Sequence, residues 1–161
     1  MRPGGASPLF GIVGRKNAGK TTLVVALVRE LTGRGLTVAT IKHAHHAFAV
    51  DREGTDSHAH RMAGAAEVLL AGGGRWALMH EGADEPPLRD LAARLSPADI
   101  VLVEGYKREA HPKIELRRGG EPLRADEASN VRAVVGDDGR FGADEVAAIA
   151  DLALAEAAPL A

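Results

Sequence analysis

Residues 14–21 read Gly-Arg-Lys-Asn-Ala-Gly-Lys-Thr, which fits the phosphate-binding pattern G-x-x-x-x-G-K-[ST] at every fixed position. An apolar run over residues 9–13 precedes this stretch, and residues 20–34 have the apolar character of a helix packed against a sheet. A strand that ends at a glycine-rich turn and continues into a helix is the context in which this pattern binds phosphate. The sequence therefore predicts a P-loop, where main-chain N–H groups and a helix dipole hold a phosphate chain.

Each fixed residue of this loop has a chemical role. Gly14 and Gly19 let the backbone approach phosphate oxygens closely, because they carry no Cβ. Lys20 supplies a mobile cation for the β- and γ-phosphates, and the Thr21 hydroxyl is a ligand for Mg²⁺. We expect the nucleotide to contact Gly14, Arg15, Lys16, Asn17, Ala18, Gly19, Lys20, Thr21 and Thr22.

An acidic residue follows a second buried strand. Residues 100–103 are a continuous apolar run, and Glu104 emerges at its carboxyl end, where ligands bind in open α/β sheets. We predict that Glu104 holds a Mg²⁺-bound water or polarises the attacking water. The alternative is an ordinary carboxylate at the end of a strand. Lys20 and Glu104 are thus the candidate catalytic residues, and Thr21, Glu104 and, through water, Asp51 are the candidate metal-binding residues.

Apolar periodicity along the chain predicts an alternation of strands and helices. Strands are expected over residues 9–13, 36–41, 67–71, 75–80, 100–103, 113–116 and 131–135, and helices over residues 20–34, 56–65, 87–95 and 143–158. The two strands around Gly72–Gly74 resemble a hairpin. This order predicts an α/β class fold: a three-layer P-loop NTPase fold with a mostly parallel central sheet and an added β-hairpin. It is expected to be a single nucleotide-binding domain over residues 8–161 behind a flexible leader of residues 1–7.

Composition excludes several classes of protein. The chain has 161 residues, a formal net charge of −2, 3% aromatic residues and no cysteine. Nucleic-acid binders and binders of anionic membranes need a basic surplus, and base stacking needs aromatic side chains, so we expect neither kind of partner. The lack of cysteine excludes disulfides and cysteine-ligated metals. With no apolar segment at the N-terminus, we expect a cytoplasmic protein.

Two further compositional features concern polar residues. Of the seven histidines, five lie within residues 43–60, and three interpretations stay open: zinc or nickel ligation, a loop that senses the γ-phosphate and contacts an acidic ligand, or a solvated loop. The chain also holds only five lysines against 15 arginines. Such a chain keeps lysine where a compact point charge suits better than a planar fork. The lysines are Lys16, Lys20, Lys42, Lys107 and Lys113.

Four segments together resemble the molybdopterin-guanine dinucleotide biosynthesis protein B family. They are residues 14–23 (GRKNAGKTTL), 40–65 (the histidine-rich loop), 67–81 (EVLLAGGGRWALMHE) and 98–115 (ADIVLVEGYKREAHPKIE). The resemblance covers about residues 8–137. It implies GTP binding with Mg²⁺, weak GTP hydrolysis, a homodimer, and an accessory role beside the molybdenum cofactor guanylyltransferase, which attaches GMP to molybdopterin.

The resemblance also carries roles to particular residues. Glu104 takes the acidic position after the Walker-B-like strand, and Asp51 with residues 43–46 takes a loop between the phosphate site and the partner surface. Arg15 stands where related dimeric P-loop ATPases have a signature lysine, so no such lysine is predicted. An anionic pterin phosphate would favour a basic surface near Lys42, Arg61, Lys107 and Lys113.

The sequence holds no N-K-x-D motif for reading guanine. Asp137, at the end of the last predicted strand, is our candidate for pairing with the guanine N1 and N2 donors; the alternative is a turn aspartate. Two other functions stay open. A metallochaperone-type GTPase would use the histidines for nickel or zinc, and a small-molecule kinase would use Asp51 or Glu104 as its base.

Overall fold

The computed structural model describes residues 6–44, 50–119, 121–136 and 140–160. The chain forms two compact units, one made of Met1–His43 with Pro87–Ala161 and the other of Ala44–Pro86. Most of the predicted leader, residues 1–5, lies outside the described residues. The predicted single domain over residues 8–161 stays a prediction.

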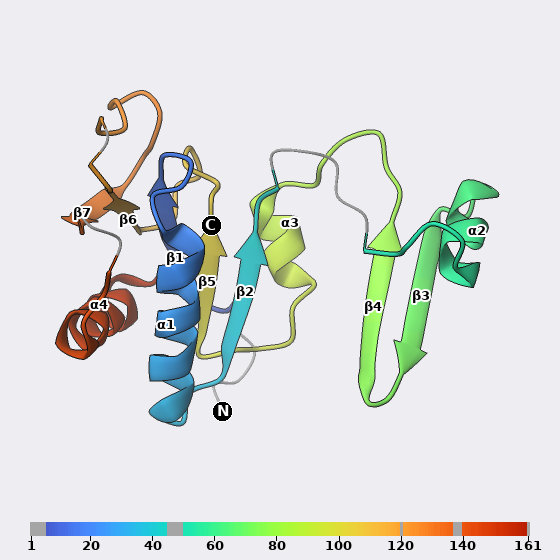
Figure 1. Ribbon diagram of the computed structural model, residues 1–161, viewed down its shortest axis with the longest axis horizontal. Coiled ribbons are helices and arrows are strands. Elements are labelled where there is room, and N and C mark those ends of the chain that lie inside the picture. The colour runs from blue at the N-terminus through green and yellow to red at the C-terminus, as the bar shows by residue number, and fades with distance from the viewer. Residues whose placement is uncertain (1–5, 45–49, 120, 137–139, 161) are drawn as a thin grey trace. The chain divides into compact units, whose positions relative to one another are not determined.

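The first unit is built on a parallel sheet of five strands in the order β2-β5-β1-β6-β7 (Figure 1). Every neighbouring pair runs parallel, so the carboxyl ends of the strands lie at the same edge. The strands are β1 (Leu9–Gly14), β2 (Val38–Lys42), β5 (Ile100–Glu104), β6 (Lys113–Leu116) and β7 (Val131–Val135). The helices of this unit are α1 (Lys20–Gly33), α3 (Leu88–Ala93) and α4 (Ala143–Glu156).

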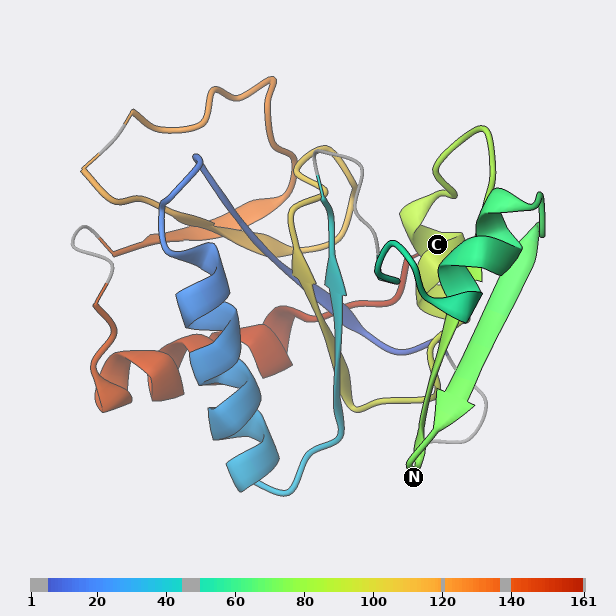
Figure 2. The same cartoon turned by 45° about the vertical axis from the view of Figure 1, so that its right-hand side comes forward.

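Helices cover the two faces of this sheet as separate layers. Successive residues of a strand point to opposite faces, and the core divides accordingly. Phe10 and Ile12 pack with residues of α1 and α4, whereas Leu9 packs with Leu88 of α3. Figure 2 shows α1 and α4 crossing on the same face of the sheet. The predicted three-layer α/β fold is thus confirmed.

The face of β6 that points away from α1 and α4 carries buried polar groups. Lys113 is fully buried, and its ammonium donates to the carbonyl oxygens of Glu109 (2.5 Å), Ser129 (2.7 Å) and His111 (2.8 Å). This ammonium therefore connects the segment that precedes β6 with a segment that follows it, on the polar face of the strand. The predicted basic surface at Lys113 is wrong, because the side chain lies inside the protein.

His111 is buried beside Gly11 and Lys113, and neither ring nitrogen has a hydrogen-bond partner. Burial and the charge of Lys113 lower the pKa of His111 from 6.5 to about 4. Between about pH 4 and pH 6.5, the unfolded chain therefore binds a proton that the folded chain does not bind. The stability that neutral His111 allows is present above pH 6.5 and is lost as the pH falls through 4.

We expect acidification from pH 7 to pH 4 to cost the native protein about 3 kcal/mol through this one residue. His111→Phe removes the titrating group while keeping an aromatic ring, so its free energy of unfolding falls less over this range. Chemical denaturation at pH 7 and pH 4 measures the difference. The control variant His60→Phe makes the same substitution at an exposed histidine. Equal slopes for His111→Phe and wild type would contradict the prediction.

The second unit consists of helix α2 (Asp56–Met62) and an antiparallel hairpin of β3 (Glu67–Gly72) and β4 (Arg75–His80). The register pairs Leu69 with Leu78 and Ala71 with Trp76, so these side chains share one face of the hairpin. Leu69, Leu78 and Trp76 are all exposed, Trp76 by 68%. The predicted hairpin is confirmed, and one of its faces is apolar and bare. Among the described residues, no helix has the length and apolar character to cross a membrane.

Candidate nucleotide-binding site

The loop between β1 and α1 has the backbone that the glycine pattern requires. Gly14 has φ 155° and Gly19 has φ 93°, conformations that favour glycine. A Cβ on Gly14 would also collide with the carbonyl oxygen of Leu116 in the neighbouring strand. Asn17, between the two glycines, adopts φ 63°, which asparagine tolerates better than most residues. The loop therefore curves tightly around the N-terminus of α1, as an anion-binding loop does.

Lys20 curls back over this loop. Its Nζ donates to the carbonyl oxygens of Arg15 (2.7 Å) and Gly14 (3.2 Å). Burial lowers the pKa of Lys20, Glu104 raises it, and the charges of Lys107 and Lys42 lower it further. A cation held beside a ring of main-chain amides, with other lysines nearby, makes the loop strongly attractive to a phosphate chain.

Glu104 lies where β5 ends and is 8% exposed. The Thr21 hydroxyl donates to its carboxylate, with distances of 3.0 and 3.2 Å to the two oxygens. Lys42, at the end of β2, lies 3.3 Å from the Thr21 hydroxyl and 3.4 Å from Glu104 Oε1. The strands position this contact directly, because Lys42 and Glu104 are partners in the β2–β5 register. The structure thus brings together Lys20, Thr21 and Glu104, three residues that we singled out in the sequence.

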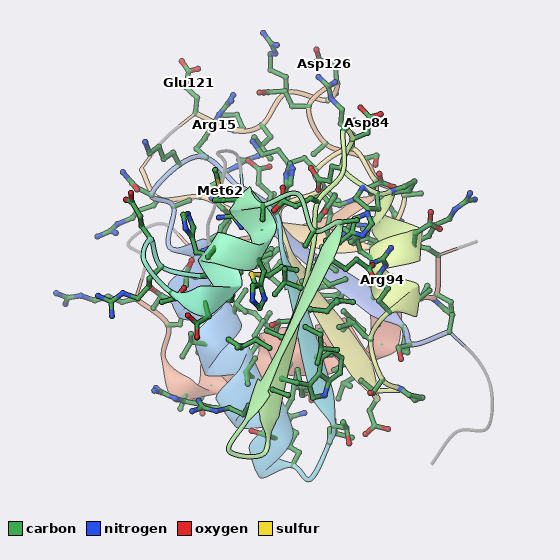
Figure 3. The ribbon with its side chains drawn as sticks, turned by 90° about the vertical axis from the view of Figure 1, so that its right-hand side faces the viewer. Arg15, Met62, Asp84, Arg94, Glu121 and Asp126 are labelled. Atoms are coloured by element: carbon green, nitrogen blue, oxygen red, sulfur yellow. The ribbon has the colours of Figure 1, made fainter. Side chains whose placement is uncertain are left out.

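Two carboxylates orient arginines beside the loop, and we did not single out either carboxylate in the sequence. Arg15 makes a bidentate contact with Glu127, at 2.7 and 2.8 Å, and Arg117 makes one with Glu115, at 3.0 Å twice. Glu115 also accepts the main-chain N–H of Leu123. The chain over residues 121–128 is therefore attached both to the P-loop and to β6. A small cavity lies here; it is lined by Arg15, Lys16, Ala18, Leu116, Arg117, Arg118 and Glu121, of which Figure 3 labels Arg15 and Glu121.

Asp51, predicted to contact Mg²⁺ through water, lies in the second unit. Arg61 donates to both of its oxygens, at 3.0 and 3.1 Å, and this hydrogen bonding lowers the pKa of Asp51. Asp51 is thus paired with an arginine, and its role toward Mg²⁺ stays a prediction.

Other candidate residues fall outside the described part of the chain or show a different arrangement. Asp137, His45 and His46 lie outside it. Across residues 6–44, 50–119, 121–136 and 140–160, no three or more His, Asp or Glu side chains gather as a metal site.

His43 stacks on Tyr106, with ring centroids 4.6 Å apart. Tyr106 lies two residues after Glu104 and has φ 51°. A tyrosine in this left-handed conformation stores strain next to the site.

The family model described as molybdopterin guanine dinucleotide synthesis protein B matches residues 9–137. The chain belongs to the MobB family. A molybdopterin-guanine dinucleotide biosynthesis adapter protein of Haemophilus influenzae is 46% identical over 113 residues, which are 69% of this chain and 64% of that protein. The protein of the same name from Escherichia coli is 42% identical over 80% of this chain and 75% of its own length. The match therefore spans somewhat less than two thirds of the Haemophilus relative.

Solved structures of MobB proteins share the fold. A MobB homologue from Bacillus stearothermophilus superposes with a TM-score of 0.60 at 26% identity, covering 92% of this chain and 96% of that chain. A crystal structure of molybdopterin-guanine biosynthesis protein B gives a TM-score of 0.64 at 27% identity, covering 91% and 98%. Bacillus subtilis MobB, with a TM-score of 0.68, is 24% identical over 93% and 98% of the two chains.

Proposed function

We propose that this MobB-family protein binds Mg²⁺-GTP on the loop from Gly14 to Thr22 and acts in the cytoplasm as an accessory protein of molybdenum cofactor biosynthesis. It assists the formation or delivery of molybdopterin guanine dinucleotide, beside the guanylyltransferase and molybdopterin. The names of the relatives from Haemophilus influenzae and Escherichia coli support this role. The observation that carries the nucleotide part is the convergence of Lys20, Thr21 and Glu104 at the start of α1.

The donor set at this point fits Mg²⁺. A threonine hydroxyl and a carboxylate are oxygen ligands of the kind that Mg²⁺ prefers, with phosphate oxygens and waters completing the shell. The ammonium group of Lys42, seated beside both, indicates that these oxygens attract a cation. Thr21 and Glu104 would hold the metal, directly or through water, and the metal would neutralise charge on the phosphates.

Hydrolysis is expected to be slow. Fast P-loop GTPases use an arginine finger, which raises the rate about 10³–10⁵-fold, or a glutamine that orients water. The arginine of the loop itself, Arg15, is bound to Glu127 and to the carbonyl oxygen of Pro122. Glu104 would orient a water, and Lys20 would stabilise charge on the phosphates. A slow hydrolase suits a protein whose bound nucleotide selects between two states of a partner surface.

Calorimetry with GTP, ATP and GDP, each with Mg²⁺, tests this function. We expect GTP to bind more tightly than ATP, with Asp137 as the candidate guanine-reading residue. Asp137→Asn should weaken GTP relative to ATP. Equal affinity for ATP and GTP would refute guanine selection, and an absence of binding by any nucleotide would refute the proposed function.

A second experiment separates this function from that of a small-molecule kinase. The protein is incubated with candidate acceptors and with GTP labelled at the γ-phosphate, and the label should appear only in inorganic phosphate.

The hairpin supports a homodimer. A two-stranded hairpin alone is marginally stable in water, and the face with Leu69, Leu78 and Trp76 leaves its apolar side chains uncovered. A second copy of the chain would cover this face with the same residues, as a two-fold interface does. We therefore assign the dimer contact to the bare face of β3 and β4.

Trp76 is the single tryptophan of the chain and reports on this contact directly. Its fluorescence emission should shift to shorter wavelength as protein concentration rises, because a dimer buries the indole ring. Trp76→Glu should shift sedimentation to the 16.8 kDa monomer at micromolar concentration. Leu154→Glu, at an exposed leucine of α4, is the matched control and should stay dimeric. A wild-type monomer at this concentration would remove the proposed dimer.

A further inference from the structure

The environment of Lys42 differs from that of the other lysines at the site. Lys20 is committed to two carbonyl oxygens of the P-loop, and its position follows from the motif. Lys42 instead lies at the end of β2, and its side chain is 60% exposed. Its ammonium approaches the Thr21 hydroxyl and the Glu104 carboxylate, the two groups that fit Mg²⁺. A mobile cation therefore lies beside the proposed metal ligands.

We propose that Lys42 is a placeholder for the metal ion and the residue that distinguishes a nucleoside triphosphate from a diphosphate. This inference rests on the proposed nucleotide site. Before nucleotide binds, the Lys42 ammonium balances the buried charge of Glu104. Glu104 would hold the Mg²⁺ that binds with the nucleotide, and the Lys42 ammonium, which competes for the same carboxylate, would leave it. The terminal phosphate is then the anion that Lys42 pairs with.

The backbone around Lys42 allows the side chain to move while the strand stays in place. Lys42 is the register partner of Glu104, and the N–H of His43 donates to the carbonyl oxygen of Glu104 at 2.9 Å. The His43 ring then stacks on Tyr106. The end of β2 is thus anchored on both sides of the lysine, whose flexible four-carbon stem carries the charge.

A lysine at position 42 suits the role of a placeholder for a metal ion. A lysine ammonium is a compact point charge, as a metal ion is, whereas a guanidinium is a planar fork. The chain has only five lysines among 20 basic residues. Lys42, Lys107 and Glu104 all act electrostatically on Lys20, so three of the five lysines lie near one another at the P-loop. Two net positive charges remain there once Glu104 is counted, which suits the added charge of a third phosphate.

Calorimetry with GTP and GDP, each with Mg²⁺ and each with EDTA, tests the inference on wild type and Lys42→Met. In Mg²⁺, the preference of wild type for GTP over GDP should fall about tenfold in Lys42→Met, because one charge-assisted contact to the terminal phosphate is lost. The gain in GDP affinity on adding Mg²⁺ should become larger in Lys42→Met, since no ammonium competes for Glu104. The two ratios therefore change in opposite directions.

Arg29→Met is the matched control. It removes a positive charge from an exposed position of α1, two to three turns beyond the loop, and should leave both ratios at their wild-type values. If Lys42→Met weakens GTP and GDP by the same factor, or changes neither ratio, Lys42 contributes only general attraction and the inference is wrong. If wild type binds neither nucleotide, the proposed function itself fails. Thermal denaturation of both variants shows whether the fold is intact.

Discussion

Lys20→Ala is expected to weaken GTP binding by about 100-fold while the protein stays folded. The Lys20 ammonium lies over the loop, within 3.2 Å of two main-chain carbonyls, and a bound triphosphate would present oxygens in place of those carbonyls. Hydrogen bonds to charged groups contribute about 1.5–3 kcal/mol each, and about 2.7 kcal/mol corresponds to a factor of 100 in Kd. The side chain is half-buried and makes no salt bridge in the described structure, so its truncation should change the unfolding temperature little.

Calorimetry measures the loss, with Arg29→Ala as the control for a lost charge on α1. The pH dependence gives a second check. Because burial lowers the pKa of Lys20, its charge and therefore GTP affinity should begin to fall at a lower alkaline pH than an ordinary lysine would allow. An affinity within threefold of wild type would show that the phosphates do not occupy the loop.

The elements of the fold were predictable because each is a local pattern. The strand over Ile100–Glu104 is a continuous apolar run, and α1 begins directly at the lysine of the loop, as the motif requires. The order of strands was not predictable in the same way. β5 pairs between β1 and β2, although about 60 residues separate it from β2 in the chain. Such pairing depends on which apolar faces meet after folding, and the periodicity of one strand carries no information about its neighbour.

The same contrast between local patterns and distant contacts applies to the candidate site. Gly14 to Thr22 form one contiguous segment, and Glu104 was identified because a buried strand ends there. Glu127 was not, since its partner Arg15 is 112 residues away in the chain. A surface loop rich in charged residues gives no local signal that one carboxylate holds the P-loop in place.

The sequence pattern of β6 does not match the environment of this strand in the structure. Lys113, Ile114, Glu115 and Leu116 alternate charged and apolar residues, which is typical of a strand with one face in water. In the structure all four are buried, because the segments before and after β6 fold over the polar face. The signal that was available is the rarity of lysine in this chain, which marks each lysine as a position where the ammonium matters.

Among substitutions that remove one charged side chain, Lys113→Met should therefore be the most destabilising. The variant keeps the apolar stem but leaves the carbonyl oxygens of Glu109, His111 and Ser129 without their donor. Each lost hydrogen bond to a charged group costs about 1.5–3 kcal/mol, and removal of a buried charge offsets part of the total. We expect a net loss of about 2–4 kcal/mol in the free energy of unfolding. Lys16→Met, at an exposed lysine, should change it by less than about 0.5 kcal/mol.

The pH dependence separates a buried ammonium from a simple packing defect. Burial lowers the pKa of Lys113 from 10.5 to about 8, while Glu109 raises it in part. Between pH 8 and pH 10.5 the unfolded chain thus binds a proton that the folded chain has released, so this group adds stability as the pH rises. Lys113→Met lacks the group, and the difference from wild type should widen from pH 7 to pH 10. A constant difference would mean that Lys113 has the same pKa in both states, with its three carbonyl contacts offsetting the desolvation of its charge, and would contradict the prediction.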